Sequence, residues 1–180
     1  AFGQNNVVSR NLSFNAGVPG SATFTAGDAN FNSGYASMAF GSNNRSINAN
    51  SFAANFNTIA NASYMTAFGH FNDTVTAVKG PSYLQTEMLF AIGNGSNNAN
   101  RRNSFTMMRN GFTAINTSLT TGPSIPRAEL DIKGTGALIV PVGTSAERPV
   151  TPVVGMIRFC TDCGSSPVLQ GYDGTAWVNL

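Results

Sequence analysis

Large apolar and small polar residues alternate along the first part of the chain, and the alternation recurs every seven residues. Eight seven-residue units follow one another without interruption over residues 20–75. In most units the fourth and sixth positions are small, the fifth is large and apolar, and the seventh is either small or large. A period of two nested within a period of seven is typical of short strands that stack as a solenoid. The pattern therefore predicts a repeating β-coil.

The first position of most units is Gly or Asn, which tolerate the positive φ of a corner. Two units, about fourteen residues, are expected to complete one turn, because a single odd unit would reverse the strand faces. The predicted corners are Gly20, Gly27, Gly34, Gly41, Asn48, Asn55 and Gly69. The large residues at the fifth and seventh positions are expected to point inward and form a thin core, made of Phe24, Phe31, Met38, Phe40, Phe52, Ile59 and Phe68.

After residue 75 the composition changes and the register ends. Gly80 and Pro81 break the pattern, which suits a connector. Later apolar runs predict short strands over 87–95, 104–108, 128–133 and 137–142, and two more around the cysteine turn in 155–180. No amphipathic helix is predicted. The predicted domains are a heptad-repeat β-roll over 1–75, a connector over 76–86, a β-rich neck-like segment over 87–127 and a C-terminal β-hairpin module over 128–180.

Charged residues are scarce, at 10% of the chain, against about a quarter in ordinary globular proteins. A surface of this kind is solvated by Asn, Ser and Thr or is buried against another chain. The net charge of +2 is small and scattered, which argues against a nucleic-acid partner. No apolar run approaches the roughly 18 residues that a membrane-spanning segment needs, so membrane insertion is not expected.

Cys160 and Cys163 are the only cysteines, and they lie in a Cys-Thr-Asp-Cys-Gly turn. Three interpretations stay open. A local disulfide suits an extracellular protein and is the first, and a reduced structural pair is the second. A zinc site is the third, but one C-x-x-C supplies only two ligands, so neighbouring chains would have to supply the rest.

No set of residues indicates catalysis. His70 is the only histidine, and its proximity to Asp73 suits a hydrogen-bonded turn better than a general base with its partner. The sequence therefore predicts that the protein is not an enzyme and predicts no cofactor and no metal.

Several segments resemble known bacterial and phage surface proteins. Residues 37–41 (Ser-Met-Ala-Phe-Gly) and 66–69 (Thr-Ala-Phe-Gly) resemble the repeats of YadA-like trimeric autotransporter heads, and this likeness extends over residues 1–75. Residues 155–159 and 171–180 resemble a C-terminal module of bacterial surface-fibre and phage tail-fibre proteins. The resemblance implies a left-handed parallel β-roll that assembles as a homotrimer. Asn48, Asn55 and Ala62 depart from the corner Gly, and Arg45 departs from the apolar fifth position.

A homotrimer also has a physical motive, because a thin solenoid alone buries little apolar area to offset the cost of ordering its backbone. The expected function is that of a structural subunit of an extracellular trimeric fibre or adhesin, on a bacterial cell surface or a virion, with head-to-tail polymerisation as a further step. The alternative is a receptor- or glycan-binding tip of a phage tail fibre or injection system. The aromatic candidates for sugar platforms are Tyr35, Tyr64, Tyr83, Tyr172 and Trp177.

Overall fold

The structure is a computed structural model and describes residues 23–74, 84–118 and 126–180. The chain divides into two compact units between Gly134 and Thr135. The C-terminal module was expected to begin at residue 128, but β11 (Leu130–Ile132) pairs with β10 (Thr113–Ser118) and so belongs to the first unit. The predicted corner Gly20, the repeats before residue 23 and most of the predicted connector 76–86 lie outside the described residues.

The first unit is a parallel β-coil in which long and short strands alternate. The long strands are β1 (Phe24–Asp28), β3 (Met38–Ser42), β5 (Phe52–Phe56) and β7 (Thr66–His70). The short strands are β2 (Phe31–Asn32), β4 (Arg45–Ser46) and β6 (Ile59–Ala60). Phe24 pairs with Met38, Met38 with Phe52 and Phe52 with Thr66, so one coil takes fourteen residues (38 − 24). This confirms the predicted all-β solenoid and its two units per turn.

The inside of the coil is lined by small residues, which reverses the predicted core. The sixth-position residues Ala39, Ala53 and Ala67 are fully buried. The predicted core residues lie on the outside and are exposed or half-buried: Phe24, Phe31, Met38, Phe40, Phe52, Ile59 and Phe68. The prediction was wrong because the two walls are too close to hold aromatic rings. Asn32 on one wall donates to the carbonyl oxygen of Phe24 on the other, at 3.0 Å.

The interior is polar in the first coils and apolar in the later ones. Asn44 is fully buried, accepts from the backbone nitrogen and hydroxyl of Thr58, and donates to Asn30 Oδ1 at 3.0 Å. The later interior contains a cluster of buried apolar residues: Ala53, Ala60, Ala62, Met65, Ala67, Met88, Ala91 and Met108. Asn44 therefore depends on partners one coil away on both sides, whereas Asn32 and Ser37 bond to each other within one coil.

The corners follow two rules, of which the sequence indicated one. Gly27, Gly41, Asn55 and Gly69, at the first position of alternate units, have positive φ. Gly34 and Asn48 do not, but a Cβ on Gly34 would lie 2.0 Å from Asn48 O, so close approach requires glycine there. The third position of every unit from residue 27 to residue 71 also has positive φ, and its residues are Ala29, Ala36, Asn43, Asn50, Asn57, Tyr64 and Phe71. The sequence did not indicate this position, because none of these residues is glycine.

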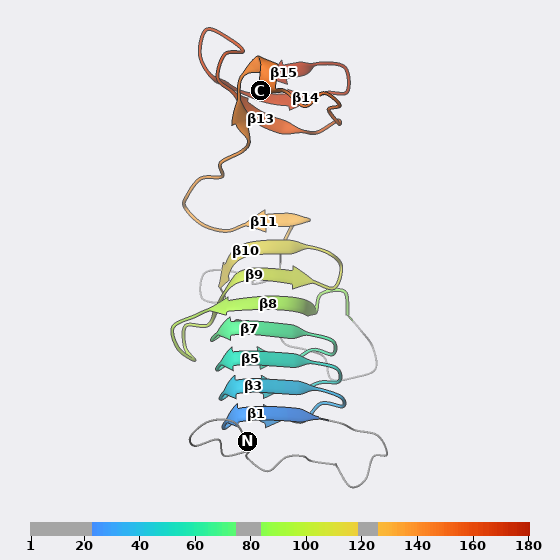
Figure 1. Cartoon of the computed structure of the whole chain (residues 1–180), viewed down its shortest axis with the longest axis vertical. Coiled ribbons are helices and arrows are strands. Elements are labelled where there is room, and N and C mark those ends of the chain that lie inside the picture. Colours follow the sequence, from blue (N-terminus) through green and yellow to red (C-terminus); the bar gives the residue numbers. More distant parts are fainter. Residues whose placement is uncertain (1–22, 75–83, 119–125) are drawn as a thin grey trace. The chain divides into compact units, whose positions relative to one another are not determined.

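The sheet continues beyond the regular coils. Strand β8 (Met88–Asn94) adds to β7 in parallel, with Ala67 opposite Ala91. Strand β9 (Arg102–Met108) then pairs antiparallel with β8 and with β10, and β11 closes the sheet. The resulting eight-stranded sheet is seen as one ladder of arrows from β1 to β11 (Figure 1). The predicted strands near residues 87–95 and 104–108 are thus present, whereas β10 was not predicted.

The second unit is a small mixed sheet in the order β12 (Val142–Gly143), β13 (Ile157–Cys160), β14 (Val168–Tyr172) and β15 (Trp177–Asn179). A single-turn 3-10 helix, η2 (Ser145–Glu147), follows β12. The predicted strand over 137–142 is reduced to its last residue. No helix in the described part of the chain has the length and apolarity needed to cross a membrane.

Candidate functional site

Six phenylalanine rings form a continuous row on the outer face of the eight-stranded sheet. Neighbouring ring centroids are 5.1–6.0 Å apart. The row, called here the phenylalanine ladder, consists of Phe24, Phe40, Phe52, Phe68, Phe90 and Phe105. Tilted and edge-to-face contacts at these separations are favourable between aromatic rings.

The repeat explains why the ladder forms. The fifth and seventh positions of a long strand both point outward, because the sixth points inward. The phenylalanine alternates between these two positions from coil to coil: Phe24 lies beside Met38 in one column, and Phe40 lies beside Ala26 in the other. Strands about 4.8 Å apart can then carry a ring in every coil without collision.

The ladder face is apolar and exposed in the single chain. Phe24 is 50% exposed and Met38 is 47% exposed. Across the six strands that carry the rings, β1, β3, β5, β7, β8 and β9, the only Asp, Glu, Lys or Arg residues are Asp28 and Arg102. A large apolar face with so little charge is typical of an interaction surface.

The opposite wall of the coil has a different outer face. Its outward residues are Phe31, Arg45 and Ile59, aligned across β2, β4 and β6. The guanidinium carbon of Arg45 lies 5.6 Å from the centroid of the Phe31 ring. A cation stacked on a ring is compatible with water, because the charge stays solvated while the ring is covered. Charge therefore favours the ladder face over this one as the buried surface in an assembly.

The structure places His70 and Asp73 in separate local contacts. His70 Nδ1 donates to Gly95 O at 2.5 Å, and the His70 ring lies against Phe71. Asp73 is fully buried, and its carboxylate accepts from the backbone nitrogen of Thr74. Asp73 thus makes a contact within its own turn, whereas the His70 hydrogen bond goes to a carbonyl group 25 residues away.

Cys160 and Cys163 are joined by a disulfide, the first of the three interpretations, with their Cα atoms 5.6 Å apart. Cys160 ends β13 and is fully buried. Arg148 Nη2 donates to Cys163 Sγ and to Gln170 Oε1, both at 3.1 Å. The bridge and this arginine tie the segment after β13 to β14. With both sulfurs in the bridge, neither is a thiolate that could bind zinc.

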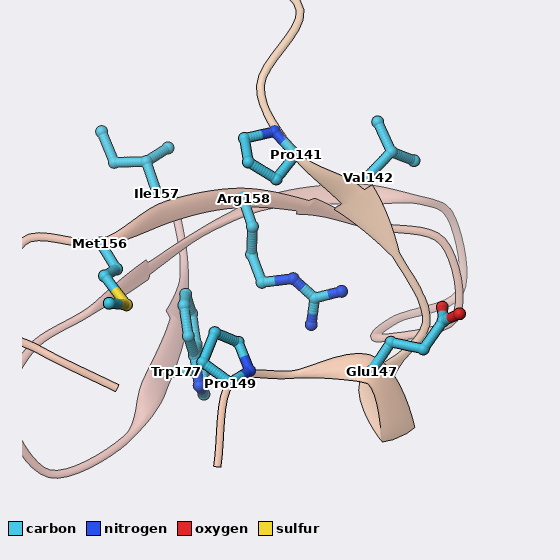
Figure 2. Close-up of a pocket in the computed structure, with 8 residues that line it drawn as sticks. All are labelled: Pro141, Val142, Glu147, Pro149, Met156, Ile157, Arg158 and Trp177. Carbon is cyan, nitrogen blue, oxygen red and sulfur yellow. The ribbon is translucent and has the colours of Figure 1, made fainter. Parts of the chain in front are cut away.

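The second unit contains a pocket of about 370 Å³. Its apolar wall consists of Pro141, Val142, Pro149, Met156 and Ile157. Arg158, Glu147 and Trp177 complete the lining, and the Arg158 side chain points into the space between the other two (Figure 2). The sequence indicated Trp177 as a candidate sugar platform but neither charged residue as part of a site. The positions of Glu147 and Arg158 around one pocket depend on how η2 folds beside β13.

The pKa of Glu147 is lowered, first by the hydrogen bond from the backbone nitrogen of Thr144 and then by that from its hydroxyl. These two donors lie 2.7 and 2.9 Å from Glu147 Oε2. The carboxylate therefore stays ionised at neutral pH. A charged acceptor and a charged donor thus line the same apolar pocket.

The fold agrees with the coarse architecture that the resemblance implies, a β-solenoid followed by a small β-sheet. Comparison of the chain with protein-family models, curated proteins and solved structures gives no match.

Proposed function

We propose that the protein is a non-catalytic structural subunit of an extracellular homotrimeric fibre or adhesin. The observation that carries the proposal is the phenylalanine ladder. It occupies the outer face of the long sheet, repeats in step with the coils and is bordered by almost no charge. A second copy of the chain has the same spacing between strands, so its ladder matches this one along the whole length.

The energetics support assembly through this face. Burying a phenylalanine side chain contributes about 1.5–3 kcal/mol. The ladder offers six such rings per chain, whereas the interior of the coil is lined mainly by small residues. Packing around a threefold axis would bury the ladders of all three chains at once. Left-handed coils, as in the heads that the repeats resemble, are part of this proposal.

The ends of the sheet support a further step, head-to-tail polymerisation. Strand β11 is the last strand of the eight-stranded sheet and carries Leu130 and Ile132, both exposed. An edge strand presents unpaired backbone groups that can pair with a strand of another chain. An extracellular place, on a bacterial surface or a virion, suits a chain with a disulfide and scarce charge.

The native mass of matched variants tests the proposal. In the double variant Phe40→Ser/Phe52→Ser two central rings of the ladder are lost. The control Phe31→Ser removes an equally apolar, 50% exposed ring from the other wall. We expect the unmodified chain and the control to have three times the 18.8 kDa mass of one chain, and the double variant to dissociate. A monomeric mass for the unmodified chain would reject the trimer.

The alternative function, a receptor- or glycan-binding fibre tip, is favoured by one observation, the pocket of the second unit.

A further inference from the structure

We propose that the pocket in the second unit binds one neutral sugar residue of a glycan. This goes beyond the structural role proposed above and does not depend on the trimer. At about 370 Å³ the pocket is within the usual range for small ligands, about 300–1,000 Å³. Its lining combines an aromatic ring, one cationic donor and one anionic acceptor.

Arg158 is the donor. Only 5% of the residue is exposed, and its Nη2 donates to Thr144 O at 2.9 Å. Its guanidinium carbon lies 5.8 Å from the centroid of the Trp177 ring, so the group is held on two sides. Nη1 is buried and makes no hydrogen bond within the described residues. A buried donor without a partner is costly, and an acceptor brought by a ligand would remove that cost.

Glu147 is the acceptor. Thr144, which accepts a hydrogen bond from Arg158, also donates to Glu147. Thr144 donates to Glu147 through its backbone nitrogen and its hydroxyl, while its carbonyl oxygen accepts from Arg158. Both charged groups are therefore fixed before a ligand arrives. Prepared polar groups on an otherwise apolar wall give orientation at little entropic cost.

Gly143 lies against the ends of both charged side chains. A Cβ at this position would lie 2.9 Å from Arg158 Nη2 and 3.0 Å from Glu147 Oε2. Any larger residue would therefore displace both groups. Glycine here lets the guanidinium and the carboxylate keep the positions that they have beside the pocket.

The balance of charge indicates a neutral ligand. A carboxylate-bearing sugar would gain from Arg158 but would be repelled by the ionised Glu147. A purely apolar side chain would leave Arg158 Nη1 without a partner. A neutral sugar has hydroxyls that both donate and accept, and an apolar face that can lie against the apolar wall beside Trp177, the only tryptophan of the chain.

Fluorescence of Trp177 provides the test, because no other tryptophan contributes. The intact protein is titrated with methyl glycosides of glucose, galactose, mannose and N-acetylglucosamine, and in parallel with glucuronic acid and N-acetylneuraminic acid. We expect at least one neutral glycoside to give a saturable change with a Kd of about 1 mM. Because Nη1 is closed to water in the free chain, a lining side chain must shift on binding, and this shift should be visible in the signal.

Two variants and one control locate the site. Gly143→Ala displaces the ends of both charged side chains, and Glu147→Gln removes the anionic acceptor at nearly constant size. Each is expected to weaken binding about tenfold or more. Gly136→Ala is the matched control, since a Cβ at Gly136 meets nothing within 4 Å. It should bind like the unmodified chain.

Several outcomes would overturn the inference: no saturable change with any neutral glycoside, tighter binding of the acidic sugars, or unchanged binding in Gly143→Ala. Protection of Trp177 from acrylamide quenching without any sugar would also overturn it, because another copy of the chain would then fill the pocket. The native mass measured on the same samples tests the trimer separately from sugar binding. Binding by a monomer would reject only the assembly, and a trimer without binding would reject only the pocket.

Discussion

The inner and outer faces of the coil are made by neighbouring residues of the same strands, yet they have opposite compositions. Ala53 is fully buried inside, and Phe52 beside it carries a ring of the ladder outside. The inner face is filled by small side chains and hydrogen-bonded pairs within one chain. The outer face holds the large apolar groups, which stay exposed or half-buried within the described residues. The described part of the coil thus fills its interior and keeps a large apolar area on its surface.

The first prediction breaks this division by placing a ring inside. Ala53→Phe is expected to destabilise the coil by about 3 kcal/mol or more, because the fully buried site between Ala39 and Ala67 has no room for the added volume. Urea unfolding followed by circular dichroism, at fixed protein concentration, measures the loss.

The matched control puts the same ring on the outer face. Ala26 lies beside Phe40 on the outer face, where an added ring can turn toward solvent, so Ala26→Phe should lower the free energy of unfolding by only about 1 kcal/mol or less. Equal losses in the two variants would contradict the division into a narrow inside and a permissive outside.

The second prediction concerns the polar part of the interior. Asn44→Ala leaves Thr58 and Asn30 without the side-chain partner they share, and is expected to cost about 2–3 kcal/mol. Asn44→Thr copies Thr58, which occupies the same position one coil later, and should lose less. If the two variants unfold at the same urea concentration, the buried hydrogen bonds are not what stabilises the first coils.

The third prediction concerns a corner residue with positive φ, Ala36. Ala36 has φ 48° in the column where the next coil has Asn50 at φ 55°. Asparagine tolerates this conformation better than alanine, so Ala36→Asn should raise the free energy of unfolding by about 0.5–1 kcal/mol. Ala49→Asn, next to the column but without positive φ, is the control and should give no gain.

The fourth and smallest effect is expected in the second unit. The pKa of Asp173 is lowered, first by the hydrogen bond from the backbone nitrogen of Ala176 and then by that of Thr175. A lowered folded pKa means that the unfolded chain binds the proton more tightly. The stabilisation is therefore present above the ordinary value, about 3.9, and is lost as the pH falls through the folded pKa. Asp173→Asn should flatten this part of the pH profile, measured as thermal unfolding between about pH 5 and pH 2. An unchanged profile would show that the turn does not contribute.

These features differ in how far the sequence could predict them. The period of seven was enough to predict the coil, because residues fourteen apart lie in the same column and residues seven apart lie on opposite walls. The alternation of Phe52 and Ala53 predicted that the strand has two different faces. It did not predict which face points inward, because the alternation is the same in both cases. The width of the coil decides that, and it depends on contacts such as Asn32 to Phe24 across the walls.

The site in the second unit was harder to predict for a related reason. Glu147 and Arg158 are eleven residues apart in the sequence. They line the same pocket because both form hydrogen bonds with Thr144. No local period marks such a pair. The cysteines, three residues apart, were identified at once because their spacing alone permits a bridge.

Cryo-electron microscopy of the purified native protein tests the central claim most directly. We predict cross-sections with three coils around one axis, in which Phe40, Phe52 and Phe68 of each coil face a neighbouring copy. Single coils with these rings in contact with solvent would contradict the account.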